Sequence, residues 1–299
     1  MRVLLTGSHG LIGSKLLEKL RQNGHTPISL VRHESQLNEN TLLWDPEHFE
    51  LIPENFEGFD ACINLAGENI SGVWTEEKKR KIKNSRALRT HMLSEFLAGL
   101  QNRPKVMISA SAVGYYGSQG EEILHEESPA GSGFLAEVCQ AWEEAAKPLS
   151  NVGCRVVNPR FGVVLAKNGG ALSKMLPPFR FGFGGKIGSG QQYMSWIALD
   201  DLISLLIFLL ENETLSGPVN AASPNPVTNK AFTKTLGKVL QRPTVFPLPA
   251  FLVKLLLGQM GEELLLASQR VSTEKIMSAG FSFQTPELEQ ALQHILKEK

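Results

Sequence analysis

Three glycines at regular spacing follow an apolar segment at the start of the chain. Residues 2–13 read RVLLTGSHGLIG, which places glycine at positions 7, 10 and 13. Gly7 lets the chain turn sharply off a strand, Gly10 leaves room for a pyrophosphate, and Gly13 lets the next helix pack closely on a sheet. The helix N-terminus then offers N–H groups and partial positive charge to the phosphates. We therefore predict a dinucleotide site formed by Thr6, Gly7, Ser8, His9, Gly10, Leu11, Ile12 and Gly13.

The end of the second predicted strand indicates which dinucleotide binds. NAD sites usually place Asp or Glu there, to accept hydrogen bonds from the ribose hydroxyls. Here the position is held by Val31 and Arg32. A guanidinium suits a 2′-phosphate through charge-assisted, bidentate hydrogen bonds, so NADP(H) is favoured. A solvated surface arginine is the alternative, and Glu34 is close enough to keep NAD open.

Composition excludes several classes of protein. The chain has 30 basic and 30 acidic residues, so its net charge gives no reason to expect nucleic acid or an anionic membrane as a partner. Cys62, Cys139 and Cys154 show no CxxC spacing, and none of the seven histidines pairs with another at metal-ligand spacing, so no metal site is predicted. The N-terminal strand leaves no room for a signal peptide, and the apolar run 202–210 is too short to cross a bilayer. We expect a cytoplasmic protein.

The elements that must position these residues alternate between strand and helix. Such alternation predicts an α/β fold, a Rossmann-like doubly wound parallel sheet with both faces covered. We expect strands at Val3–Thr6, Ile28–Arg32, Leu42–Trp44, Ala61–Ala66, Val106–Ser111, Arg155–Leu165 and Pro218–Ala222, and helices at Leu11–Gln22, Thr75–Leu100, Phe134–Lys147 and Asp200–Leu210.

Composition changes at Asn168, where Gly, Pro and Phe become frequent and a loop-rich stretch is expected. We predict a nucleotide-binding core over residues 1–167, with its sheet completed by about 195–222. Residues 168–194 and 223–299 then form a small C-terminal lobe that covers the substrate.

Several motifs together resemble a known group of enzymes. TGSHGLIG at Thr6–Gly13, NLAG at Asn64–Gly67 and SASAVGYYG at Ser109–Gly117 are similar to the extended short-chain dehydrogenase/reductase superfamily. FLAEVCQAW at Phe134–Trp142 and GGKIGSGQQYMSW at Gly184–Trp196 resemble more closely its atypical subgroup, the epimerase family related to sugar-nucleotide epimerases. The resemblance covers essentially the whole chain. One departure is Ala198, where the family has a histidine.

The resemblance implies further nucleotide contacts beyond the glycine loop. A structural role alone would also explain three of the residues involved. Leu65 and Val164 are apolar strand residues, and Arg86 lies in a basic, solvated helix. The implied contacts are Leu65, Ala66, Gly67, Arg86, Ser109 and Val164.

The catalytic side of the resemblance is incomplete. The superfamily normally supplies a Tyr proton donor and, four residues later, a Lys that lowers its pKa. This chain has Phe134 and Val138 at those positions, and neither can carry a proton. Ser111 stands where the superfamily places a hydroxyl aimed at the substrate oxygen. Tyr115 and Tyr116 are the nearest alternative donors, although a packing role is favoured for each.

Two functions follow from this combination. The first is an NADP(H)-dependent oxidoreductase or epimerase that transfers hydride at nicotinamide C4 of the cofactor to or from a small polar substrate, such as a nucleotide sugar. The second is a non-catalytic protein that binds NADP(H) as a sensor and passes its state to a partner protein. The intact cofactor motifs favour the first, and the missing Tyr and Lys favour the second.

Overall fold

A parallel sheet forms the centre of the molecule. The structure, a computed structural model, describes residues 1–45 and 52–297. The strands run in the order β12-β8-β5-β4-β1-β2-β3, with β6 extending the line of β5 beside β8, and every pair is parallel. The chain thus builds outward from β1 on both sides, which is the doubly wound arrangement. The strands are β1 (Arg2–Thr6), β2 (Thr26–Val31), β3 (Thr41–Leu43), β4 (Ala61–Asn64), β5 (Val106–Ser109), β6 (Ser111–Ala112), β8 (Arg155–Phe161) and β12 (Gly217–Ala221).

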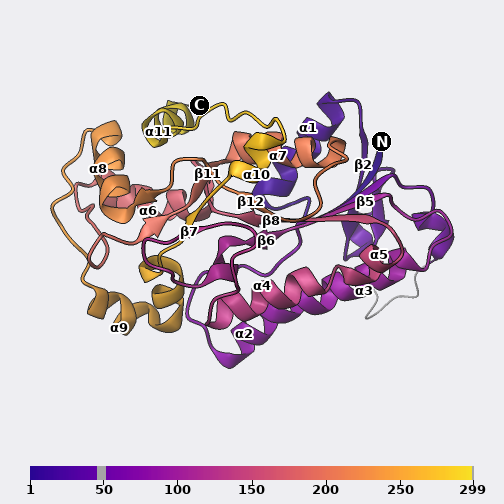
Figure 1. The fold of residues 1–299 in the computed structure, drawn as a ribbon, viewed down its shortest axis with the longest axis horizontal. Coiled ribbons are helices and arrows are strands. Elements are labelled where there is room, and N and C mark those ends of the chain that lie inside the picture. The colour runs from indigo at the N-terminus through magenta and orange to yellow at the C-terminus, as the bar shows by residue number, and fades with distance from the viewer. Residues whose placement is uncertain (46–51, 298–299) are drawn as a thin grey trace.

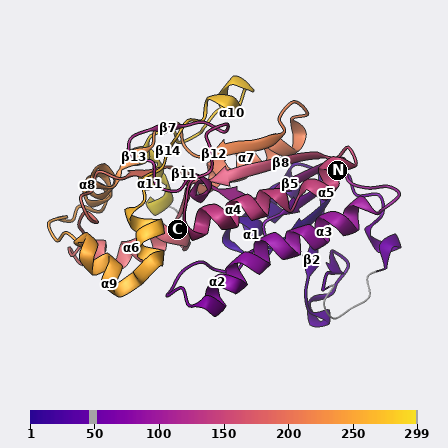
Figure 2. The same ribbon diagram turned by 60° about the horizontal axis from the view of Figure 1, so that its bottom comes forward.

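Helices cover both faces of this sheet (Figure 1). On one face, α1 (Leu11–Gln22) and α7 (Leu199–Glu211) pack on the aliphatic side chains of β1, β4 and β5. On the other face lie α3 (Arg89–Ala98) and α5 (Lys147–Asn151), with α4 (Phe134–Glu144) beside them. Figure 2 shows α2 (Glu76–Lys83), α3 and α4 running along this second face. Because both faces are buried, the central strands β1, β4 and β5 are apolar except at their ends.

A smaller lobe lies beside the end of the sheet where the central strands finish (Figure 1). Its third core cluster joins Trp196 and Phe232 to the apolar faces of the lobe helices. The lobe contains α6 (Gly170–Arg180), α8 (Asn229–Leu240), α9 (Ala250–Gly261), α10 (Glu274–Ser278) and α11 (Leu288–Lys297), with the short strands β7 (Ile123–Leu124), β9 (Val163–Ala166), β10 (Tyr193–Met194), β11 (Trp196–Ala198), β13 (Val227–Thr228) and β14 (Arg270–Val271). Single-turn helices occupy Glu34–Gln36, Pro53–Phe56, Val113–Tyr116 and Glu262–Leu266.

Several expected elements differ from those observed. The loop-rich stretch after Asn168 contains α6, which includes Pro177 and Pro178 in its last turns. Burial explains this helix, because Leu172, Leu176 and Phe179 of its apolar face are nearly inaccessible to solvent.

The other differences are interruptions. The helix expected over 75–100 contains a π-helical turn at Asn84–Leu88, and the helix expected to reach Lys147 ends at Glu144 before α5 begins. The strand expected over 155–165 is divided at Gly162 into β8 and β9. A Cβ on Gly162 would lie 2.6 Å from the carbonyl oxygen of Ser195, so the close approach of another segment accounts for this break.

Among the described residues, no helix is long and apolar enough to cross a membrane.

Candidate functional site

The glycine loop connects β1 to α1 at the C-terminal edge of the sheet. Gly7 has φ +72°, and a Cβ there would lie 2.9 Å from the carbonyl carbon of Leu65. A Cβ on Gly13 would lie 2.1 Å from the carbonyl oxygen of Gly7, so any side chain at position 13 would displace the loop. The structure therefore gives the first and third glycines the roles predicted for them, a sharp turn and close helix packing.

The N-terminus of α1 fits the phosphates of a dinucleotide. Gly10 is its N-cap, no side chain caps its first N–H groups, and no acidic residue lies in its first turn. The uncapped donors and the helix dipole both favour an anion at this position. The N-terminus of α4 is different, because Glu263 accepts hydrogen bonds from the backbone nitrogens of Phe134 and Leu135 at 3.0 and 2.8 Å. Of these two helix ends, α1 is the one that remains available.

Buried polar side chains hold the neighbouring loop against the glycine loop. Thr6 Oγ1 donates to Asn64 Oδ1 at 2.7 Å and accepts from the backbone nitrogens of Leu65 and Ala66, both at 3.1 Å. Asn64 Nδ2 donates to the Ser109 hydroxyl at 3.3 Å. The Thr6 hydroxyl has thereby used its one donor and two acceptors. Thr6 and Ser109 thus support the loop through Asn64, and their predicted contacts with the nucleotide stay a prediction.

Arg32 lies just beyond β2 and is exposed, beside the buried Val31. No hydrogen bond or ion pair engages its guanidinium within the described residues, so all its donors are available to a ligand. Val164, on β9, also lies near the loop. Gly169 contacts the side chain of Leu11, and a Cβ on Gly170 would lie 3.2 Å from the Val164 carbonyl oxygen. The start of α6 therefore lies against the start of α1.

The π-helical turn at residues 84–88 presents Arg86 to the same edge. Nη1 of Arg86 donates to the carbonyl oxygens of Glu68 and Ile82 at 3.0 and 3.3 Å. A Cβ on Gly67 would lie 3.1 Å from the guanidinium carbon, so Gly67 leaves the space that Arg86 fills. Arg86 also lies 5.0 Å from the ring centroid of Trp142, whose Nε1 is the buried polar side-chain atom without a partner among the described residues. Burial lowers the pKa of Arg86. Single π-turns of this kind often occur at functional sites.

An apolar cluster occupies the positions where a Tyr and a Lys were missing. Phe134 packs edge-on against Trp74, with ring centroids 5.1 Å apart, and Val138 is buried in the same cluster with Met260 of the lobe. Val138 is 2 % exposed, so a charged side chain there would lack water. The first turns of α4 therefore pack between the core and the lobe.

A family model described as "NAD dependent epimerase/dehydratase family" matches residues 3–222. The chain belongs to this epimerase/dehydratase family. A second model, a domain of unknown function (DUF1731), matches residues 248–295, which include α9, α10 and most of α11.

Relatives of the same family match over the full length of the chain. An epimerase family protein of Mycobacterium leprae is 41 % identical over 293 residues, which cover 98 % of this chain and 94 % of the relative. The human epimerase family protein SDR39U1, solved with NADPH, has a TM-score of 0.90 and 33 % identity, with both chains covered completely. The nucleoside-diphosphate sugar epimerase of Corynebacterium glutamicum has a TM-score of 0.80 and 38 % identity, covering 99 % of this chain and 58 % of that one.

Within this epimerase-family chain, Ser111 is turned away from solvent into a charged network. Ser111 is 1 % exposed, and its hydroxyl donates to Glu143 Oε1 at 2.7 Å. Arg160 donates to both oxygens of Glu143, each at 2.8 Å, and from Nη1 to the Tyr116 hydroxyl and the Glu126 carbonyl oxygen. The single proton of Ser111 is thus engaged by Glu143, so the hydroxyl can only accept a hydrogen bond from a substrate.

Both tyrosines of the GYYG turn belong to this network. Tyr116 is fully buried, donates to Asn220 Oδ1 at 2.7 Å, and its pKa is raised to about 12 by burial. The Arg160 guanidinium lies over the Tyr115 ring, 3.5 Å from its centroid. Asn220 also bonds the carbonyl oxygens of Leu124 and Ser272, which extends the network from the core to the lobe. This geometry suits packing and alignment for both tyrosines; their predicted role as proton donors stays a prediction.

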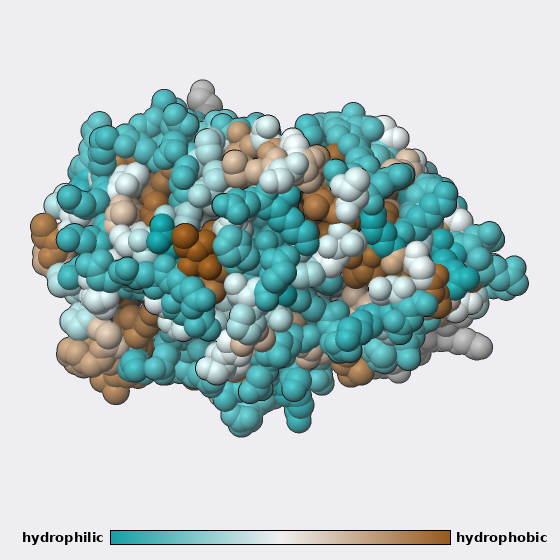
Figure 3. Space-filling view, in the orientation of Figure 1, coloured by the Kyte–Doolittle hydropathy of each residue, from teal (hydrophilic) through white to brown (hydrophobic). Residues whose placement is uncertain are grey.

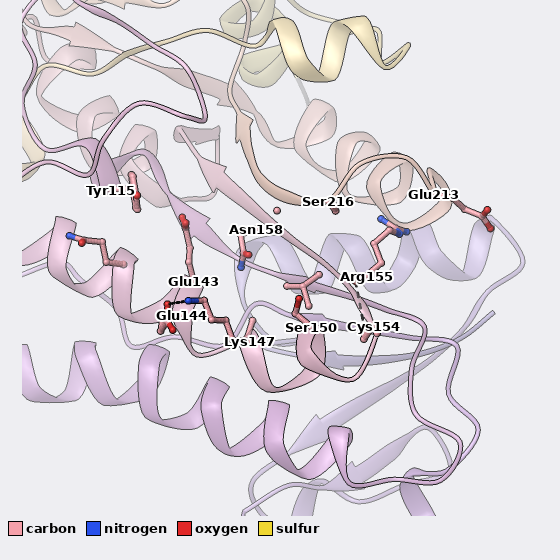
Figure 4. Close-up of a pocket in the computed structure, with 15 residues that line it drawn as sticks. Tyr115, Glu143, Glu144, Lys147, Ser150, Cys154, Arg155, Asn158, Glu213 and Ser216 are labelled. Atoms are coloured by element: carbon pink, nitrogen blue, oxygen red, sulfur yellow. Dashed lines mark hydrogen bonds and ion pairs between the residues drawn. The ribbon is translucent and has the colours of Figure 1, made fainter.

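A groove opens on the far side of this network. It has a volume of about 820 Å³ and runs along β8 between α4, α5 and the segment before β12. Figure 4 shows Tyr115 and Glu143 toward one end and Arg155 toward the other, with the Lys147–Glu144 ion pair at its rim. Arg155 donates to three carbonyl oxygens near the end of α7, so its charge is occupied structurally. The groove exposes the Glu143 carboxylate only slightly.

The lobe contributes a further cation, Arg270, that no sequence motif predicted. Arg270 lies 4.9 Å from the Tyr193 ring centroid and is half-buried, and no carboxylate pairs with it in the part of the chain that the structure describes. The Ser195 hydroxyl fixes this segment, since it donates to the Gln269 carbonyl and accepts from the Val271 nitrogen. The Ser195 carbonyl in turn accepts from Val163, directly after β8. An anionic group of a substrate could pair with Arg270 at this end of the sheet.

Neither metals nor disulfides contribute to the site described here. Within residues 1–45 and 52–297, no group of three His, Cys, Asp or Glu side chains could hold a metal ion. Cys62, Cys139 and Cys154 are free and buried, and burial raises the pKa of each thiol. A raised pKa removes the thiolate needed for nucleophilic chemistry.

Proposed function

We propose that the protein binds NADP(H) and is an oxidoreductase or epimerase that transfers hydride at nicotinamide C4 of this cofactor. One observation carries the proposal: the uncapped N-terminus of α1 faces a glycine loop that side chains at positions 7 and 13 would disrupt. The phosphates, the adenosine ribose and the nicotinamide half would each meet suitable groups, at α1, at Arg32, and at Gly67 with Arg86. The human relative solved with NADPH supports this choice of ligand.

Arg32 is the basis for choosing NADP(H) over NAD(H). Its guanidinium has no carboxylate partner within the described residues, so it would pair with a 2′-phosphate without first breaking another interaction. In an NAD(H) complex the same charge would gain no equivalent partner. Arg86 is the second cation at the site. It would supply, from the π-helical turn, the positive charge that Val138 cannot provide on α4.

For the substrate we propose a small polar molecule with an anionic group, such as a nucleotide sugar. The name of the Corynebacterium glutamicum relative supports that class, and Arg270 offers a partner for its phosphates. When bound, the cofactor would supply or accept the hydride. Ser111 would contribute by aligning Glu143, and the proton would come from Tyr115, Tyr116 or an ordered water. Buried, unpaired thiols are consistent with a reducing compartment, and we propose a cytoplasmic location.

Titrations of the purified protein with NADPH and NADH, followed by nicotinamide fluorescence, test the choice of cofactor. We expect at least a tenfold tighter Kd for NADPH, because a charge-assisted bidentate pair contributes roughly 1.5–3 kcal/mol. Arg32→Ala should remove that preference and leave NADH binding unchanged. Arg21→Ala, on an exposed part of α1, is the matched control. Equal affinities of the native protein for the two nucleotides would refute the assignment.

A second candidate function is the binding of NADP(H) as a sensor without turnover. The cluster of Phe134, Val138 and Met260 favours it, because this cluster joins the cofactor-binding core directly to the lobe. Reduction of carbonyl compounds and nucleotide sugars by NADPH distinguishes the two functions. Turnover that is reduced by Ser111→Ala supports the enzyme. Tight NADPH binding that protects residues 168–195 from proteolysis, without consumption of cofactor, supports the sensor.

A further inference from the structure

Charge is distributed unevenly along the chain, although its net charge is zero. Residues 145–199 and 214–261 contain no Asp or Glu at all. These two segments supply α6, α8 and α9 of the lobe and the loops between them. Their basic residues within the lobe are Lys167, Lys174, Arg180, Lys186, Lys230, Lys234, Lys238, Arg242 and Lys254.

Large apolar side chains are exposed in the same segments. Phe181 is 77 % exposed and Leu255 is 76 % exposed. Figure 3 shows apolar surface at the left edge and lower left of the molecule, where Figure 1 places the lobe and α9. We call this surface the lobe tip; its apolar members are Phe181, Phe183, Val245, Phe246, Phe251, Leu255 and Leu256.

Contacts between two loops of the lobe hold these exposed side chains in place. The Phe183 and Phe246 rings lie 5.7 Å apart, and the Phe246 nitrogen bonds the Gly184 carbonyl oxygen. Arg242 Nε donates to the carbonyl oxygen of Arg180 at 2.9 Å, so the two loops are joined beside two cations. A Cβ on Gly185 would overlap the Phe246 carbonyl oxygen, which keeps the loops in contact. The apolar and basic groups thus form one supported surface.

We propose that the lobe tip binds the surface of an anionic phospholipid bilayer, as a peripheral contact and not a span. Exposed Phe, Leu and Val side chains can enter the acyl boundary while neighbouring Lys and Arg contact the headgroups. A second copy of this chain fits poorly. A twofold interface through these loops would bring Arg180 and Arg242 of one copy toward the same cations of the other. The phenylalanine rings can also stack on bases, but Val245, Leu255 and Leu256 add aliphatic surface that fits acyl chains and not nucleic acid, so lipid is the better fit.

Co-flotation of the full-length protein with vesicles tests this proposal. We expect binding to vesicles of phosphatidylcholine with about a third phosphatidylglycerol, weakened by high salt, and at least about tenfold less binding to phosphatidylcholine alone. Phe181→Ser with Phe183→Ser should lower the binding about tenfold, since two exposed aromatic rings are lost. Both positions face solvent, so folding and NADPH binding should be unaffected. Arg180→Gln with Lys186→Gln should weaken binding and reduce its dependence on salt.

Matched variants and competitors decide the outcome. The variant Leu37→Ser with Val152→Ser is the matched control. It removes two exposed apolar side chains from the surface of the nucleotide-binding part of the chain and should leave vesicle binding unchanged. Absence of flotation with anionic vesicles would overturn the proposal. So would a dimer, measured by light scattering, that the Phe181→Ser, Phe183→Ser variant dissociates. If single-stranded RNA binds the protein more tightly than the vesicles do and displaces it from them, the surface would be assigned to nucleic acid instead. None of these outcomes depends on whether the protein is an enzyme.

Discussion

Removal of either Glu143 or Arg160 should strongly destabilise the fold, even though this buried ion pair lies beside a solvent-exposed groove. Arg160 is 2 % exposed, donates twice to Glu143, and contacts the rings of both tyrosines of the GYYG turn. In Glu143→Leu the guanidinium keeps its bonds to the Tyr116 hydroxyl and the Glu126 carbonyl. Its charge, however, loses the carboxylate that offsets desolvation.

The loss in the free energy of unfolding is set by the charge that remains buried without a partner. Breaking a buried pair by removing one partner costs about 3–5 kcal/mol, a large part of the 5–15 kcal/mol that typically stabilises a domain. Arg160→Met should cost somewhat less, because the Glu143 carboxylate is 15 % exposed and retains the Ser111 hydroxyl. In the double variant no charge is left unpaired. Its cost should therefore fall below the sum of the single costs by about 2–3 kcal/mol.

Urea unfolding, followed by tryptophan fluorescence and far-UV circular dichroism, measures these free energies. Glu144→Gln is the matched control on the same helix, since its ion pair with Lys147 has exposed side chains on both partners and should contribute little. Single variants that unfold within error of the native protein would refute the reasoning. Strictly additive free energies would also refute it, because they would show that the two groups do not interact.

Three further predictions concern the core. Gly13→Ala should lower NADPH affinity at least about tenfold while Gly99→Ala does not, measured by fluorescence titration, because only the first Cβ overlaps backbone; equal affinities would contradict this. Val138→Lys should destabilise by about 3 kcal/mol or more in urea and should not create reductase activity, because the ammonium would be buried among apolar groups; a stable, active variant would show that the cluster opens. Tyr116, with pKa about 12, should ionise late in a 295 nm titration, and Tyr116→Phe should remove that late step. Since its pKa is raised on folding, its contribution to stability should be constant below about pH 10 and fall by about 2–3 kcal/mol toward pH 12.

Local sequence patterns predicted the backbone structure around the glycine loop well. Gly7 and Gly13 act through backbone contacts within a few residues, so their spacing alone contains the geometry. Helix α1 begins and ends where its apolar period and flanking glycines place it. The parallel sheet follows from alternation of apolar strands and helices. In these cases, a short segment determines its own structure.

The environment of Ser111 could not be predicted in the same way. Its partner Glu143 lies 32 positions away, and the next members, Arg160 and Asn220, come from strands that only the folded sheet brings together. The π-helical turn that presents Arg86 has no composition signal within a charged helix. Helix α6 forms despite two prolines because tertiary burial outweighs local preference. Each of these features depends on contacts between distant segments.

The contrast between the two helix N-termini relates the cofactor site to the unusual start of α4. At α1 the terminal N–H groups are left uncapped, which fits a ligand that supplies its own negative charge. At α4 the lobe supplies that charge through Glu263, while Phe134 and Val138 bury their side chains against Trp74 and Met260. A Tyr and Lys at those two positions would have to be solvated or paired where the lobe now packs. The apolar residues at the start of α4 and the docking of the lobe therefore belong together: the N-terminus of α1 stays open for the proposed dinucleotide, and the adjacent helix holds the lobe.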